Sequence, residues 1–295
     1  MVEAATGADP ELKVSVDQAE LLPGQAVTGS VRGRALPGGA DSAVVQLGYD
    51  SFEEPERSTA ELTLDLIPSA SGGHHDPTKE LIRRWNPVAS VDFSPEELVG
   101  GHRFELALPE DAPASVKNIA DWRVLARVSR AGEPELVEWE GLRVLRPASV
   151  PGCDELAVVR DDGRKTRIEL EVADLRVAPG ESVQGRVAVT TEGEVKVKRA
   201  SIALGAFHAR PANQMPARHW HLDDAEEILC EGEIVPAGTR EWSFGLRVPD
   251  DAEPSCRASA AAARWWVTAR FAYKGWGAAF ETDIARQEIL VYDAF

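Results

Sequence analysis

The stretch LLPGQAVTGSV at residues 21–31 returns as VAPGESVQGRV at residues 177–187, and Gly24 and Gly180 are 156 residues apart. In each copy a Pro-Gly pair is followed by valine, glycine and valine at alternating positions. Proline presets its own φ and glycine accepts positive φ, so the pair predicts a tight turn. This alternation predicts a strand with one buried face. The chain is therefore expected to build the same turn and strand twice.

The later half of this unit also recurs. FELALP at Phe104–Pro109 matches FGLRVP at Phe244–Pro249, and the strand-like segment Trp122–Val128 matches Trp265–Phe271. The spacing has shifted here, to 140 and then 143 residues, which places insertions and deletions between the expected strands. Surface loops tolerate such length changes. The pattern predicts two tandem copies of one β-rich domain.

Short apolar alternations, each ended by turn residues, run through both copies and are typical of an all-β sandwich. The expected strands of the first copy are Leu12–Val16, Val27–Val31, Val44–Leu47, Leu62–Leu66, Phe104–Leu108, Trp122–Val128, Leu136–Trp139 and Leu142–Leu145. Those of the second copy are Ile168–Val172, Val183–Val189, Lys196–Leu204, Glu227–Ile234, Trp242–Val248, Trp265–Tyr273 and Ile284–Val291.

One segment of the first copy carries helix signals instead. Asp76 suits an N-cap, Pro77 suits the first helical position, and Arg83 and Arg84 suit a last turn. We therefore predict a short helix over Asp76–Trp85. The alanine run at residues 258–263 is compatible with an extended loop or with one helical turn.

Length and charge limit the function classes. A chain of 295 residues suits two domains, which we place at residues 1–147 and 166–295 with a linker at 148–165. The formal net charge of −17 disfavours binding to nucleic acid or to anionic lipid. It suits solubility, or a protein partner with a basic surface. Exposed sheet edges also allow a homo-oligomer.

Cysteine usage and the N-terminal sequence point to the cytoplasm. Cys153, Cys230 and Cys256 are odd in number and widely spaced, which does not suit a disulfide framework. The first residues show no signal peptide, and no apolar run is long enough to span a membrane. We expect a cytoplasmic protein without an integral membrane segment.

The motifs for chemistry are sparse. His219 and His221 alternate and stand before Asp223 and Asp224, which suits either a metal site or a solvated polar loop. The run HHD at residues 74–76 has the same two interpretations. The cysteines have no base nearby in sequence, and there is no nucleophile elbow, phosphate loop or dinucleotide fingerprint. We predict no catalytic residue, cofactor or bound metal. A metal-dependent enzyme or carrier is the alternative.

Tryptophan is the other informative residue type. Trp122 and Trp265 occupy matching positions and are expected to fill the two cores. Alternation sends Trp266 to the opposite face from Trp265. Trp266 then either packs against the other domain or a loop, or forms an interface. Trp276, within KGWG, is expected in a hairpin turn, where it can anchor a partner or cover the sheet end.

The paired motifs resemble the arrestin-like family, and most closely its bacterial sporulation-control members. The turns at Pro23-Gly24 and Pro179-Gly180 resemble the turn that opens arrestin domains, and Phe104–Pro109 with its repeat resembles a later strand and loop. LIRR at residues 81–84 is similar to the single helix of the arrestin N-domain. The resemblance implies two tandem immunoglobulin-like β-sandwich domains with one short helix in the first.

The resemblance also implies a function. Arrestin-like proteins are non-enzymatic scaffolds, adaptors or regulators that bind proteins through loops, concave sheet faces and edge strands. The acidic charge differs from the basic phosphate-reading surfaces of receptor arrestins, so phosphate sensing is not carried over. A structural subunit of a larger assembly is a further alternative. The residues expected to contact a partner are Leu81, Arg83, Arg84, Trp85, Trp266 and Trp276.

Overall fold

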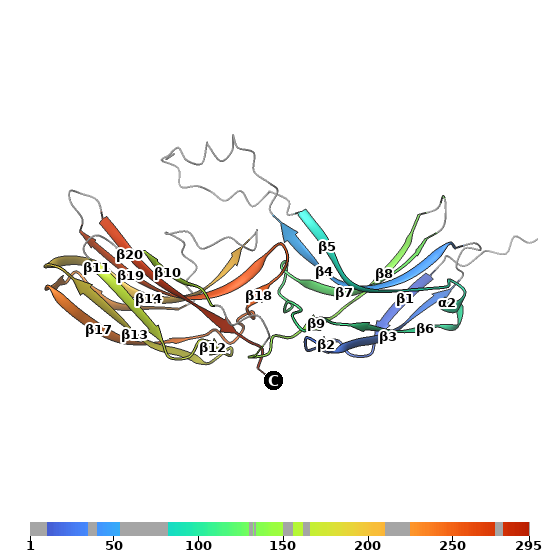
Figure 1. The fold of residues 1–295 in the computed structure, drawn as a ribbon, viewed down its shortest axis with the longest axis horizontal. Coiled ribbons are helices and arrows are strands. Elements are labelled where there is room, and N and C mark those ends of the chain that lie inside the picture. The colour runs from blue at the N-terminus through green and yellow to red at the C-terminus, as the bar shows by residue number, and fades with distance from the viewer. Residues whose placement is uncertain are drawn as a thin grey trace, which may run out of the picture.

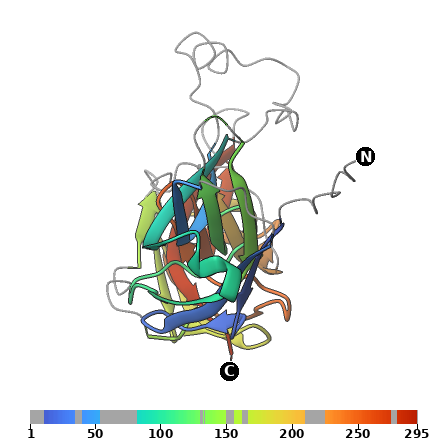
Figure 2. The ribbon, with the colours of Figure 1, turned by 90° about the vertical axis from the view of Figure 1, so that its right-hand side faces the viewer.

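The computed structural model describes residues 11–34, 40–53, 82–129, 132, 134–149, 156–161, 166–209, 225–274 and 280–294. This part of the chain is nearly all β-strand, with a single helical turn, α2 (Glu97–Gly100). The ribbon forms two lobes side by side (Figure 1). We call strands β1 to β9 the N-lobe and strands β10 to β20 the C-lobe. Figure 2 looks along the long axis with the N-lobe in front.

The N-lobe is built from two antiparallel sheets with the apolar core between them. One sheet has the order β1 (Glu11–Val16), β3 (Ala26–Arg34), β6 (His102–Ala107). The other has the order β5 (Ile82–Phe93), β4 (Ser42–Glu53), β7 (Asp121–Ser129), β8 (Leu136–Gly141). A short parallel pair, β2 (Glu20–Leu21) with β9 (Arg143–Val144), lies beside them. The sandwich expected for this part of the sequence is present.

The C-lobe repeats this plan with longer strands. Its smaller sheet has the order β11 (Thr166–Val172), β13 (Ser182–Thr191), β17 (Gly238–Arg247). The main path of its larger sheet is β10 (Val158–Asp161), β20 (Phe280–Val291), β19 (Ala262–Lys274), β14 (Val195–Ala209), β15 (Ala225–Glu231). The short strands β12 (Arg176–Val177), β16 (Ile234–Val235) and β18 (Cys256–Arg257) pair with this sheet.

The duplicated turn makes the same contacts in both lobes. Gly24 has a φ of 83° and Gly180 a φ of 82°, the left-handed region that glycine tolerates best. The residue after each glycine accepts an equivalent hydrogen bond. The Leu108 N–H donates to the Gln25 carbonyl at 3.0 Å, and the Val248 N–H donates to the Glu181 carbonyl at 2.8 Å. The sequence repeat is therefore a repeat of backbone hydrogen bonding.

The matching tryptophans also take equivalent places. Trp122 and Trp265 are both buried, as expected for core residues. Each indole N–H has a backbone acceptor, Pro113 at 2.8 Å for Trp122 and Glu253 at 2.9 Å for Trp265. A buried indole needs such a partner, because an unmet N–H would cost free energy.

The helix predicted over Asp76–Trp85 is wrong where it can be checked. Ile82–Trp85 open β5, which pairs with β4, while residues 76–81 lie outside the described residues. Strand pairing outweighs the local helix signals, and Pro87 would break a helix running through this segment. Proline is tolerated here because β5 is an edge strand and its register with β4 shifts beside Pro87.

Two further details differ from the sequence interpretation. The linker assigned to residues 148–165 contains β10, because Val158 to Asp161 pair with β20. The alanine run forms neither a helical turn nor an extended loop throughout. Ala258 donates to the Ala261 carbonyl at 2.8 Å in a tight turn, and β19 begins at Ala262. The strand expected at Leu62–Leu66 lies outside the described residues.

Candidate functional site

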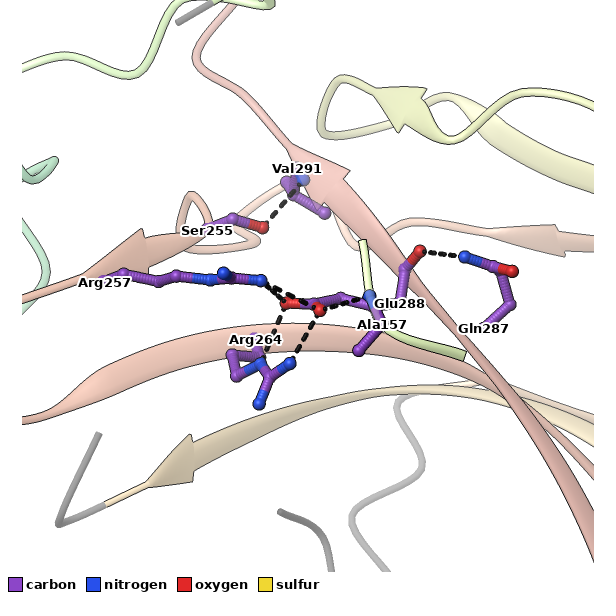
Figure 3. A network of polar contacts seen from close by, with 7 residues as sticks. All are labelled: Ala157, Ser255, Arg257, Arg264, Gln287, Glu288 and Val291. Atoms are coloured by element: carbon purple, nitrogen blue, oxygen red, sulfur yellow. Dashed lines mark hydrogen bonds and ion pairs between the residues drawn. The ribbon is translucent and has the colours of Figure 1, made fainter. Parts of the chain in front are cut away.

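A buried carboxylate is the centre of a polar cluster near the contact between the lobes. Glu288 on β20 is 3 % exposed and faces Arg264 on β19 and Arg257 on β18 (Figure 3). Residues 264 and 266 share one face of β19, opposite Trp265, which fills the core. The alternation that puts Trp265 inside therefore puts Arg264 and Trp266 on the face that carries Glu288.

Two arginines and one backbone amide hold the Glu288 carboxylate. Arg264 donates from Nε to Oε1 at 2.8 Å and from Nη2 to Oε2 at 2.7 Å, a bidentate pairing. Arg257 Nη2 lies 3.0 Å from each oxygen, and the Ala157 N–H donates at 2.9 Å. The Arg264 guanidinium also lies 4.9 Å from the centre of the Trp266 ring.

These contacts decide the ionisation of Glu288. Burial by itself raises the pKa of this carboxyl, but the hydrogen bonds from Arg264, from the Ala157 N–H and from Arg257, with the Arg257 charge, outweigh it. The net result is a pKa below the ordinary value of 4.5. Glu288 is therefore an anion that neutralises buried arginine charge and ties three strands to residue 157.

We expect the Glu288 contribution to stability to depend on pH. A lowered pKa in the folded state means that the contribution is complete above about 4.5 and is lost as pH falls through the folded-state value. The free energy of unfolding of wild type minus that of Glu288→Gln should therefore shrink on acidification. A pH series of urea denaturations measures this difference, and a value that stays constant down to about pH 3 contradicts the assignment.

The strand that carries Arg257 also enters the N-lobe. Its neighbours Cys256 and Ala258 belong to the N-lobe core, together with Ala261 and Ala263. The Cys256 thiol lies 3.1 Å from the Ala114 carbonyl oxygen. Alternation along β18 therefore presents Cys256 to one lobe and Arg257 to the carboxylate of the other.

Polar contacts close the junction on both sides of this insertion. The Ser259 hydroxyl donates to Asn86 Oδ1 at 2.8 Å, and the Ser259 N–H donates to the Tyr49 hydroxyl at 3.3 Å. At the other side Asp293 accepts from the Arg143 side chain at 2.7 Å and from the Arg146 N–H at 2.6 Å. We call the set Tyr49, Asn86, Ala114, Arg143, Arg146, Cys256–Ala263, Glu288 and Asp293 the junction.

A small cavity lies within the junction. Its volume is about 10 Å³, and Arg146, Arg257, Glu288 and Leu290 are among its lining residues. That is room for about one water molecule. Arg146 is 6 % exposed and its Nε has no hydrogen-bond partner in the described structure. The cavity is too small for an organic substrate, so the junction is suited to fastening the lobes.

The N-lobe has a second buried carboxylate between two arginines. Asp50 on β4 is 2 % exposed and lies 2.5 Å from Nη2 of both Arg83 and Arg123. Hydrogen bonding to Asp50 raises the pKa of Arg83, whereas burial lowers that of Arg123. Arg123 lies 4.6 Å from the centre of the Trp139 ring on β8. The buried Asp50 thus holds Arg123, and Arg123 in turn orients the exposed Trp139 side chain.

The expected partner-binding residues differ in their exposure and contacts. Arg83 is half exposed and paired with Asp50, Arg84 is exposed, and Trp85 is half-buried over Gly48. The interface interpretation of Trp266 is wrong, because this side chain is 1 % exposed and packs with Phe207. Large aromatic area is removed from water there, in keeping with the packing alternative.

Other expected residues lie outside the described part of the chain. They are Leu81, Cys153, His219, His221, Asp223, Asp224 and Trp276. Among the residues that are described, no group of three or more His, Cys, Asp or Glu side chains is placed to hold a metal ion. Cys230 is buried, and burial raises the pKa of its thiol, which disfavours the thiolate.

The sequence interpretation missed Glu288, Arg264 and Asp50. A signal for two of them was available, because Arg264 adjoins the tryptophan pair and residue 288 lies on the opposite side of a strand from Ile289. A charged residue beside large apolar residues of a strand is a reason to look for a buried partner. Asp50 gave no such signal, since its partners come from β5 and β7.

Comparison with known proteins adds no relative: no protein-family model and no curated protein matches this chain. Among the described helical residues, no helix is long and apolar enough to cross a membrane. The geometry of the two lobes and of the junction is therefore the basis for assigning a function.

Proposed function

We propose that this chain is a cytoplasmic, arrestin-like adaptor or scaffold. Its two tandem domains, at residues 1–147 and 166–295, bind a protein partner and catalyse no reaction. The support for the family is the duplicated turn. Its backbone hydrogen bonds from Leu108 to Gln25 and from Val248 to Glu181 join equivalent residues of the two lobes. An arrestin-like chain has this kind of repeated sandwich.

The junction is the single observation that favours an adaptor. Cys256–Ala263 belongs to the C-lobe by strand pairing and to the N-lobe by packing. A segment shared in this way resists separation of the lobes, since its removal would expose apolar surface of the N-lobe core. Two sheet surfaces held at one relative position suit simultaneous recognition of a partner by both lobes.

Affinity capture tests the proposal. Purified full-length chain, immobilised and exposed to a lysate of its native host, should retain a specific protein, and the isolated pair should bind directly in calorimetry. Because the chain is strongly acidic, the binding should weaken as salt screens the attraction. The proposal fails if nothing is retained above the level of an unrelated acidic protein at low and moderate salt.

Metal removal separates this function from a metal-dependent one. Under the proposal, dialysis against a chelator leaves the thermal unfolding midpoint and the partner affinity unchanged. The matched variant is His219→Ala with His221→Ala, which should behave like wild type in both measurements. Stoichiometric metal in the purified protein, lost in this double variant, would instead favour the enzyme or carrier.

A further inference from the structure

One exposed strand of the N-lobe combines apolar and acidic side chains in strict alternation. β8 lies at the end of the β5–β4–β7–β8 sheet, in the upper layer of the N-lobe in Figure 1. Val137 is 46 % exposed and Trp139 52 % exposed, and both face the outer side of the sheet. Glu138 and Glu140 are exposed on the other side. A strand so open to water is normally either shielded against unwanted strand pairing or used to bind a partner.

Within the described part of the chain, no cation pairs with the carboxylates of β8. No ion pair joins Glu138 or Glu140 to a described residue, whereas exposed acids such as Glu171 and Glu226 are paired with arginines at 2.9 Å and 2.6 Å. β8 therefore presents negative charge that the described residues of the N-lobe do not balance locally. A cationic partner would gain this charge complementarity.

The Trp139 side chain is exposed, but its orientation is already fixed before a partner binds. Arg123 lies against its ring at 4.6 Å and is itself held by the buried Asp50 at 2.5 Å. A side chain that is already ordered loses little conformational entropy when a partner covers it. Exposed tryptophan with this support has the character of an interface anchor.

Among the described residues, no strand is hydrogen-bonded to the outer edge of β8. β2 pairs with β9, beyond Gly141, so it covers a different part of this edge. β1 runs beside β8 in the facing sheet, but no hydrogen bond joins the described residues of the two strands, and all residues from Val137 to Gly141 are exposed. The outer backbone groups are thus placed to pair with another strand.

We propose that β8 is the docking edge for an extended, basic segment of the partner, which adds to the sheet as a further strand. Its alternate apolar side chains cover Val137 and Trp139, and its lysines or arginines meet Glu138 and Glu140. A second copy of the chain is disfavoured as the occupant, because β8 against β8 brings like charges together. This inference rests on the proposed adaptor function and specifies its partner.

A labelled synthetic peptide of about ten residues, with lysine alternating with valine and threonine, tests the edge by fluorescence anisotropy. Glu138→Lys with Glu140→Lys should weaken binding at least about tenfold, as should Trp139→Ala. The matched control is Glu105→Lys with Glu110→Lys, the same charge change on exposed residues of the same lobe, which should leave most of the affinity. Equal weakening by both double variants would mean diffuse attraction and overturn the proposal.

Backbone pairing has its own test. N-methylation of alternate residues along one edge of the peptide should abolish binding, while methylation along the other edge should spare it, because only one edge pairs with β8. Insensitivity to both patterns, or no binding at low salt, overturns the inference. If the host partner is captured equally by wild type and by the Glu138→Lys, Glu140→Lys variant, the adaptor function stands and the edge is wrong. If no host partner is retained, the adaptor function fails instead.

Discussion

Replacing Glu288 with glutamine is expected to lower the free energy of unfolding by about 3 kcal/mol, because it leaves the buried Arg264 guanidinium beside a neutral amide, whereas Arg257 is half exposed. Arg264 is 7 % exposed and donates two hydrogen bonds to Glu288. The amide offers one acceptor oxygen in place of two and carries no charge. Urea denaturation at neutral pH measures the loss.

The matched control for Glu288→Gln is Glu241→Gln. Glu241 also pairs with an arginine, Arg186 at 3.1 Å, but both side chains are about half exposed. An exposed pair contributes less than about 1 kcal/mol, so this variant should be nearly as stable as wild type. Equal losses for the two variants would show that the buried cluster has no special role in the junction.

Gly29→Ala and Gly185→Ala are each expected to lower the free energy of unfolding by about 3 kcal/mol, because both glycines lie against a neighbouring strand and an aromatic ring. A Cβ at Gly29 would lie 2.2 Å from the Ser15 carbonyl oxygen and 2.5 Å from the Phe104 ring. A Cβ at Gly185 would lie 2.2 Å from the Glu171 carbonyl oxygen and 2.5 Å from the Phe244 ring. Backbone and ring both block the new methyl group, so the strands must move apart.

Gly245→Ala is the control for this pair. Gly245 lies on β17, next to Gly185 on β13 in the same sheet, yet a Cβ there meets no heavy atom within 4 Å. Alanine should be tolerated or slightly stabilising, because glycine in a strand carries extra unfolded-state entropy. A marked loss at only one of Gly29 and Gly185 would contradict equivalence of the two lobes.

The repeated elements could be predicted because local signals and packing agree in them. Val27 and Val183 alternate with polar residues, the Pro-Gly turns require a positive φ, and Trp122 and Trp265 fill cores as expected. Each of these features depends on neighbours close in the sequence. Such segments can be predicted from the sequence because their local conformational preference agrees with their environment in the folded protein.

The elements that were missed depend on distant residues. β5 forms because Ile82–Phe93 pairs along β4, although its beginning follows helix-like signals. The Glu288 cluster joins residues 157, 257, 264 and 288, and no spacing rule connects them. Trp266 was assigned to the correct face, but what covers that face depends on Phe207 and the arginine beside it.

The distance between the lobes in solution tests the central claim most directly. Spin labels at Glu105→Cys in the N-lobe and Lys196→Cys in the C-lobe, both exposed positions, would report it by pulsed electron resonance after Cys153→Ser. Cys230 and Cys256 are buried, which protects them from labelling. A scaffold fastened at the junction predicts one narrow distance distribution that broadens in Asp293→Asn combined with Ser259→Ala. A broad distribution already present in the wild-type background would contradict the account.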